Sequence, residues 1–405
     1  MFKHDNTKPE TSTVSGAAYS GNPIVVTNPQ GAQGSTTDPK AWKFRVDCGG
    51  RTVYEGRWNW PLSPDISAVV DAVVPDIREA EEDDYYEYFC TAVEEADTFD
   101  GERLIELFVE GANSPEPLFA AYCFRGGMSA PELEAYADRR TDVFAARLLN
   151  IRSNFFMTSR TAGAMMTIRE TEIGPLYFLN DGSVRELDCH TTDGRFGNLN
   201  DRLTVGVWAF DLEGYRRHLF LTEGVLCNRF QFRLSAGRPL TVVISRADVV
   251  PERYRLKFRN RFGVFEYMEL PAALKLSGQA AEEEQDGSYS RYNAVTGCFD
   301  TLRRRMPRRT VITAENVPLC SDSRGLLADM LGSSEVYLLD LYARPLRVHP
   351  EVEELEYAAI PEEPATYTLT LTQAGGDCWP GDLTDLMAAR KARDIFSSEF
   401  SDEFE

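Results

Sequence analysis

The sequence lacks the features that mark membrane-inserted, secreted and metal-dependent proteins. No stretch reaches the roughly 18 uninterrupted apolar residues that a membrane-spanning helix needs. Residues 1–10 carry several charged side chains with no apolar run behind them, so no secretory signal is predicted. Only four histidines occur, and none has a second histidine at the spacing of metal ligands. We therefore expect a protein that is made in the cytoplasm and has no membrane span.

The common catalytic signatures are also missing. There is no glycine-rich phosphate loop, no dinucleotide-binding glycine pattern after a strand and no GxSxG nucleophile turn. The neighbouring Cys189 and His190 would point to opposite faces of a strand, and the loop from Asp193 to Asp201 departs from the spacing of a calcium loop. The sequence therefore predicts no catalytic residue, no cofactor and no metal, and a chain that is not an enzyme.

The cysteines give no framework for disulfides or zinc. All eight are scattered, and no CxxC pair occurs. Because the expected compartment is reducing, we predict that they are reduced and mostly buried as small apolar side chains.

Basic residues are scarce relative to acidic ones, 43 against 64, which gives a net charge of -21. Such an excess repels the phosphates of nucleic acids and anionic lipid headgroups, so sequence-specific nucleic-acid binding is not expected. Two interpretations stay open: the charge only keeps the protein soluble, or it lines a ring through which DNA slides without sticking.

Length and composition indicate a mainly β protein with a few helices, built from two β-barrel or β-sandwich units. Its start is rich in Thr, Ser, Gly, Asn and Pro, and its end has good helix formers. The predicted parts are a flexible N-terminal arm (1–40), a β-rich domain (41–250) with an inserted helix near 130–149, a second β-rich domain (251–374) with a short helix near 322–331, and a C-terminal helical acidic tail (375–405).

Several strands and two hairpins are predicted from alternation and turn residues. Trp42–Val46 and Val53–Tyr54 flank the Gly49-Gly50 pair, which is typical of a hairpin with a primed turn. Leu176–Leu179 and Val184–Leu187 flank Asn180-Asp181-Gly182 and predict a second hairpin. Further strands are expected at 104–109, 118–124, 203–210, 218–222, 230–234, 240–245, 254–258, 311–313, 336–342 and 366–372.

A cluster of arginines stands out because the chain is so acidic. Its members are Arg303, Arg304, Arg305, Arg308 and Arg309. Three interpretations stay open: a solvated face, a contact with carboxylates of the same or a neighbouring subunit, and a phosphate clamp. The carboxylate partner is favoured over the phosphate because acidic residues are abundant.

The C-terminal tail carries a second candidate contact. Phe396, Phe400 and Phe404 are four residues apart, so on a helix they would share one face surrounded by acidic residues. This stripe would either fold back onto its own domain or dock into a groove on a neighbouring subunit.

Several segments of the sequence carry a family resemblance. They are Leu148–Met157, Leu176–Asp181, Leu256–Leu270, Tyr289–Asn293, Val311–Leu319, Thr366–Thr372 and the closing Asp394–Phe404. Together they resemble uncharacterised structural proteins encoded in the tail modules of phages and prophages of gut Bacteroidetes. The closing segment is also similar to the phenylalanine-and-acid ends of many phage tail proteins.

The resemblance implies a virion structural protein of a phage tail tip or baseplate, acting as a ring-forming or adaptor subunit. Its partners would be other copies of itself and neighbouring tail or baseplate proteins. The arginine cluster and the phenylalanine stripe would then be the two different patches that cyclic closure needs. A ring is the first hypothesis.

The alternative is a receptor- or carbohydrate-binding tail module. In it, Trp58, Trp60 and Trp379 would stack on sugar rings, whereas core packing is the ordinary role for Trp58 and Trp60. A hydrolase is a remote third reading.

Overall fold

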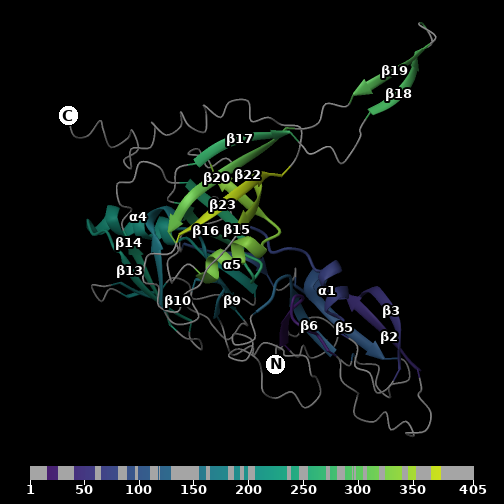
Figure 1. The fold of residues 1–405 in the computed structure, drawn as a ribbon. Coiled ribbons are helices and arrows are strands. Elements are labelled where there is room, and N and C mark those ends of the chain that lie inside the picture. The colour runs from purple at the N-terminus through teal and green to yellow at the C-terminus, as the bar shows by residue number, and fades with distance from the viewer. Residues whose placement is uncertain are drawn as a thin grey trace. The chain divides into compact units, whose positions relative to one another are not determined.

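A computed structural model gives the fold, which is mainly β with few helices, as the sequence predicts (Figure 1). Contacts divide the chain into two units: unit 1 comprises Met1–Arg246 with Arg259–Glu266, and unit 2 comprises Ala247–Phe258 with Tyr267–Glu405. The structure describes residues 16–25, 41–59, 65–80, 89–95, 99–109, 117, 119–128, 155–160, 165–180, 187–191, 196–198, 206–234, 239–245, 254–270, 274–280, 288–293, 295, 298–303, 308–318, 324–339, 345–352 and 366–374.

The first sheet of unit 1 has the strand order β1-β6-β5-β2-β3. The predicted hairpin with a primed turn is confirmed, because β2 pairs with β3 around Gly49 and Gly50, whose φ angles are 55° and 77°. Helix α1 (Ser67–Val73) buries Val70 in a core shared with Phe44 and Val46 of β2. The strands are β1 (Gly16–Tyr19), β2 (Ala41–Cys48), β3 (Arg51–Asn59), β5 (Leu104–Val109) and β6 (Phe119–Phe124).

Part of the expected N-terminal arm belongs to this sheet instead. Strand β1 pairs in parallel with β6, and Ala17, Ala18 and Tyr19 are buried. Ile24 is 1% exposed and belongs to the same core. The short apolar run is flanked by polar residues and glycines. Composition therefore predicts that residues 16–25 belong to a flexible arm (1–40), and for these residues the prediction is wrong.

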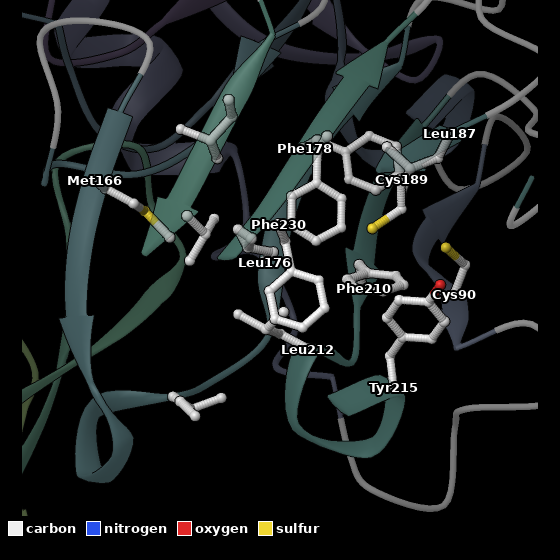
Figure 2. Packing of buried hydrophobic residues seen from close by; sticks show 14 of the residues in the cluster. Cys90, Met166, Leu176, Phe178, Leu187, Cys189, Phe210, Leu212, Tyr215 and Phe230 are labelled. Atoms are coloured by element: carbon white, nitrogen blue, oxygen red, sulfur yellow. The ribbon is translucent and has the colours of Figure 1, made fainter. Parts of the chain in front are cut away.

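Two further sheets complete unit 1, in the orders β4-β12-β9-β7 and β11-β10-β13-β14-β8. Phe178, Phe210 and Phe230 are fully buried in a core to which both sheets contribute (Figure 2). The elements are β4 (Cys90–Glu95), β7 (Phe155–Phe156), β8 (Met165–Arg169), β9 (Leu176–Asn180), β10 (Leu187–Thr191), β11 (Phe196–Asn198), β12 (Gly206–Phe210), β13 (Arg229–Leu234), β14 (Leu240–Ser245), the π-helical turn η2 (Phe99–Arg103) and the 3-10 turn η3 (Glu170–Glu172).

The second predicted hairpin is wrong. Strand β9 pairs with β12 and β7, whereas β10 pairs with β11 and β13 in the other sheet. The turn signal at Asn180-Asp181-Gly182 therefore precedes a change of sheet. A local turn pattern does not specify which strand becomes the partner, because burial decides that choice.

The predicted strand at 218–222 is also wrong, because these residues lie within helix α4 (Leu212–Glu223). Asp211 caps the helix by accepting a hydrogen bond from the Gly214 backbone N–H, and Gly224 ends it in the left-handed region with φ of 66°. Leu212, Tyr215 and Leu219 form the buried face at helical spacing. The helix signal was present from Asp211 onward and was missed.

A polar network fixes the turn at residues 260–264 within unit 1. The Asn260 side chain donates to the Met157 carbonyl and to Glu266, and its oxygen accepts from the backbone N–H groups of Phe262 and Val264. Glu266 in turn accepts from Ser159 at 2.5 Å. Because Asn260 is only 4% exposed, its amide takes the place of water for four hydrogen-bond partners.

Unit 2 contains a seven-stranded sheet in the order β16-β15-β21-β22-β23-β20-β17. Leu326, Leu327 and Met330 of helix α5 (Arg324–Gly332) pack in its core, and this helix occupies the position predicted from sequence. The strands are β15 (Tyr254–Arg259), β16 (Phe265–Leu270), β17 (Leu274–Ala280), β20 (Arg308–Pro318), β21 (Val336–Leu339), β22 (Pro345–Val352) and β23 (Thr366–Gln373).

Two predicted elements lie outside the described residues: the helix near 130–149 and the tail at 375–405. Within the described ranges, no helix has both the length and the apolar character required to cross a bilayer.

Candidate interaction site

The connection between β17 and β20 contains a second hairpin. Strands β17 and β20 pair antiparallel from Leu274↔Ala314 to Ala280↔Arg308. Between them, β18 (Ser288–Asn293) and β19 (Cys298–Arg303) pair only with each other among the described strands. We call this separate two-stranded sheet the ribbon (Figure 1).

The register of the ribbon places complementary residue types opposite one another. Tyr292 lies opposite Phe299, and Arg291 lies opposite Asp300. Tyr289 lies opposite Leu302 at a third position. Aromatic and opposite-charge pairs of this kind each contribute about 0.2–1 kcal/mol relative to alanine pairs. The sequence of the two strands therefore favours this pairing, without help from a larger sheet.

The ribbon has two outer edges that no described strand covers. An isolated two-stranded hairpin is marginally stable in water, and open edges are templates for pairing with another strand. At its turn, Val295 is 94% exposed. The ribbon is therefore an element whose stability would increase if another strand paired with either edge.

The structure places three of the five clustered arginines where the ribbon joins the main sheet. Arg303 ends β19 opposite Ser288, and Arg308 and Arg309 begin β20 opposite Ala280 and Gln279. Arg304 and Arg305 lie outside the described residues.

The two connections that flank the ribbon differ in charge. Residues 281–287 and 304–307 connect the same two register positions, Ala280↔Arg308 and Ser288↔Arg303. The first connection has the sequence AEEEQDG and the second has RRMP, and both lie outside the described residues. The carboxylate-partner interpretation of the arginine cluster therefore stays a prediction.

The other sequence candidates are placed as follows. Cys189 of β10 is fully buried, whereas His190 is half-buried, as expected for neighbours in a strand. Trp58 of β3 lies opposite Trp42 in register. Outside the described residues lie Phe396, Phe400, Phe404, Trp60 and Trp379. The described part of the chain contains no group of three or more residues arranged to hold a metal.

Cys90, Cys189 and Tyr215 lie at one end of the unit 1 core (Figure 2). Burial raises the pKa of the Cys189 thiol to about 12, and burial also raises the pKa of Tyr215 to about 12. Both groups therefore stay protonated at neutral pH. Cys48, Cys90, Cys123, Cys189 and Cys227 are free cysteines, and all of them except the half-buried Cys48 are buried.

The ribbon was missed by sequence reasoning, although its signals are present. Two tyrosines at 289 and 292 and a glycine at 297 before Cys298 are typical of a hairpin. Comparison with known proteins finds no matching family model and no curated protein similar in sequence.

Proposed function

We propose that this chain is a virion structural protein of a phage tail tip or baseplate, acting as a ring-forming or adaptor subunit. The observation that carries the proposal is the ribbon, which is ordered in register but joined to no other described strand. Strand addition by a neighbouring subunit would complete its hydrogen bonding.

The energetics favour an assembled state for such an element. Each backbone hydrogen bond that a partner strand forms contributes roughly 0.5–1.5 kcal/mol net, and several form along a six-residue edge. The register of β18 with β19 is formed within the chain itself, which lowers the entropy lost on binding. Docking therefore needs little rearrangement within the ribbon.

The arginines at the base of the ribbon supply specificity. Guanidinium groups pair with carboxylates through two parallel hydrogen bonds, and a chain of net charge -21 presents carboxylates to its own copies. An acidic neighbour is therefore attracted to the ribbon, whereas a basic neighbour is not. The resemblance to tail-module proteins is what supports proposing this assembly for the virion.

Deleting the ribbon tests the assembly. A variant in which Asn-Gly replaces residues 281–307 keeps the β17–β20 pair, because Ala280 and Arg308 are register partners that a two-residue turn can join. Size-exclusion chromatography with light scattering should show an oligomer for the full chain and a monomer for the variant, with unchanged thermal melting.

The matched control keeps the ribbon and exchanges its charges. Arg291→Asp combined with Asp300→Arg retains an opposite-charge pair at one register position and should leave assembly intact. Full assembly of the deletion variant, or a monomeric full chain, would refute the proposal. The virion placement has its own test: the chain must be found by mass spectrometry in purified particles.

A further inference from the structure

Strand β3 is the longest edge strand of the described sheets. It covers nine residues, pairs with β2 on one side and has no described strand on the other (Figure 1). Exposed side chains follow one another along it: Arg51, Thr52, Tyr54, Glu55 and Arg57. The outer row of N–H and C=O groups of such a strand is a template for pairing with a further strand.

Two charged side chains of β3 lack a partner within the described part of the chain. Glu55 lies opposite Arg45 in the β2–β3 register, but Arg45 forms its ion pair with Asp47 at 2.9 Å. Arg57 lies opposite Lys43, and like charges directly opposite each other are unfavourable. The side chains of Glu55 and Arg57 have no hydrogen bond or ion pair there. A partner strand that brings an acid to Arg57 and a base to Glu55 is therefore favoured.

A second copy of β3 offers these charges if the two strands pair antiparallel about a two-fold axis. Opposite pairs along an antiparallel ladder alternate between a hydrogen-bonded and a non-hydrogen-bonded type. An exact two-fold axis must therefore pass through one pair, so one residue lies opposite its own copy.

Most choices of this central residue are unfavourable. Centring on Glu55 or Arg57 places two like charges together, and centring on Tyr54 places Arg51 opposite Arg57. Val53 is the extra residue of a β-bulge, where the regular ladder is interrupted. Centres nearer either end of β3 leave only a short overlap between the two strands.

Centring on Gly56 avoids these conflicts. Glu55 then lies opposite Arg57 on both sides of the axis, and Tyr54 lies opposite Trp58. Opposite-charge and aromatic pairs at directly opposite positions stabilise a sheet. Glycine leaves no side chain to meet its own copy at the axis, and a glycine inside a strand often marks the close approach of another backbone.

We propose that β3 pairs with β3 of a second copy of this chain, antiparallel and centred on Gly56. The occupant is a second copy because the charge order of β3 complements itself in this register. A two-fold contact joins copies in pairs and closes no ring, so it is additional to the ribbon contact and does not rest on it. The contact is small and therefore weak by itself, so the ribbon-deleted variant stays monomeric in chromatography.

Cysteine cross-linking of the full chain tests the register. Glu55→Cys and Arg57→Cys are made as separate variants and mixed under mild oxidation with copper phenanthroline. A non-reducing denaturing gel should show at least about fivefold more covalent dimer in the mixture than in either variant alone. In one variant alone, the two identical cysteines lie diagonally, at a separation beyond the reach of a disulfide. Thr52→Cys mixed with Arg57→Cys is the matched control, because these exposed positions are not opposite, and it should show no such gain.

Charge reversal within the same assay tests the ion pair. Adding Arg57→Glu to the Glu55→Cys variant places an acid opposite Glu55 of the other variant and should lower the yield of covalent dimer at least about threefold. Adding Glu55→Arg to the Arg57→Cys variant should then restore the yield. Thermal melting checks that all variants fold.

Equal yields in the mixture and in the single variants would overturn the inference, as would a yield that charge reversal leaves unchanged. Repeating the mixture with the ribbon deleted separates the two proposals. The gain on mixing should persist, and its loss would mean that β3 edges do not pair by themselves. A monomeric full chain that still gives the gain would refute the ribbon contact and retain the β3 contact.

Discussion

Two hairpins of this molecule are built alike and anchored differently. The β2–β3 hairpin belongs to a five-stranded sheet and places Phe44 and Val46 in a core with α1. The ribbon, β18–β19, has complementary residues opposite each other but belongs to no larger described sheet.

The difference shows that the pairing of two strands and the stability of the hairpin have separate causes. Cross-strand pairs determine which residues face each other, and they contribute tenths of a kcal/mol to about 1 kcal/mol each. Burial of side chains against other elements contributes more, about 1.5–3 kcal/mol for a large apolar residue. The first hairpin is therefore expected to unfold with its unit, and the ribbon to open alone.

The anchored hairpin should be broken most strongly at its turn. A Cβ added to Gly49 would lie 1.9 Å from the Gly101 carbonyl oxygen, in a backbone region that L-residues disfavour. Gly49→Ala should therefore lower the free energy of unfolding by about 3 kcal/mol or more, measured by urea denaturation. Gly50→Ala is the matched control, because its Cβ meets nothing within 4 Å, and it should cost about 1 kcal/mol.

Equal losses for the two glycine variants would contradict this account. They would mean that the contact with Gly101 contributes nothing and that only the positive φ matters. A small loss at both positions would place the turn outside the cooperative unit, as we expect for the ribbon.

The turn at residues 260–264 shows how strongly a polar anchor can hold a hairpin. Asn260→Ala removes two donors and an acceptor from buried partners, including the Met157 carbonyl, so unfolding free energy should fall by about 2–3 kcal/mol. Thermal and urea unfolding measure the loss. Thr222→Ala removes a hydrogen bond to the His218 carbonyl at an exposed site and should cost less than about 0.5 kcal/mol.

Sequence alone predicts the anchored parts of this fold better than the contacts between them. The strand Leu104–Val109 is predicted by its apolar content, and the strand Thr366–Gln373 by its alternation. The pair Gly49-Gly50 predicts the turn that it forms. The partner strands of β9 and β10 could not be predicted from the sequence, because each strand pairs with strands that are distant in the chain, and the choice depends on which faces become buried.

The candidate site was predicted only in part. The arginines at 303–309 were recognised by their charge, but the ribbon that they border needed the register of β18 with β19. Local patterns revealed residue types, and the structure was needed to find which faces stay open.

Alkaline pH should weaken the anchored cores before it affects the ribbon. Because burial raises the pKa of Cys189 to about 12 from its ordinary value of 9.0, the unfolded chain loses this proton first as pH rises. Stability from this group is full below about pH 9 and is lost as pH rises toward 12. Urea midpoints at pH 7.5, 9 and 10.5 should therefore decline. Cys189→Ala should make that decline shallower, and the buried Cys90, Cys123 and Tyr215, whose pKa values burial also raises, should account for the rest.

A slope in Cys189→Ala as steep as in the unchanged chain would assign the alkaline loss to other groups. Tyr215, whose raised pKa has the same sign, is then the next position to substitute.

The smallest expected effect tests the comparison directly. Tyr292→Ser in the ribbon should change the global free energy of unfolding by less than about 0.5 kcal/mol, whereas Val46→Ala should cost about 0.5–1.5 kcal/mol or more, because Val46 is fully buried.

Hydrogen exchange measures the local stability of the ribbon. In a monomer of the full chain, the backbone amides of β18 and β19 should exchange far faster than those of β2. In the assembled state, one edge of the ribbon should become protected, since a partner strand would then occupy it. Slow exchange of both strands in a monomer would instead show that the ribbon is stable without a partner, and the reason to expect strand addition would be lost.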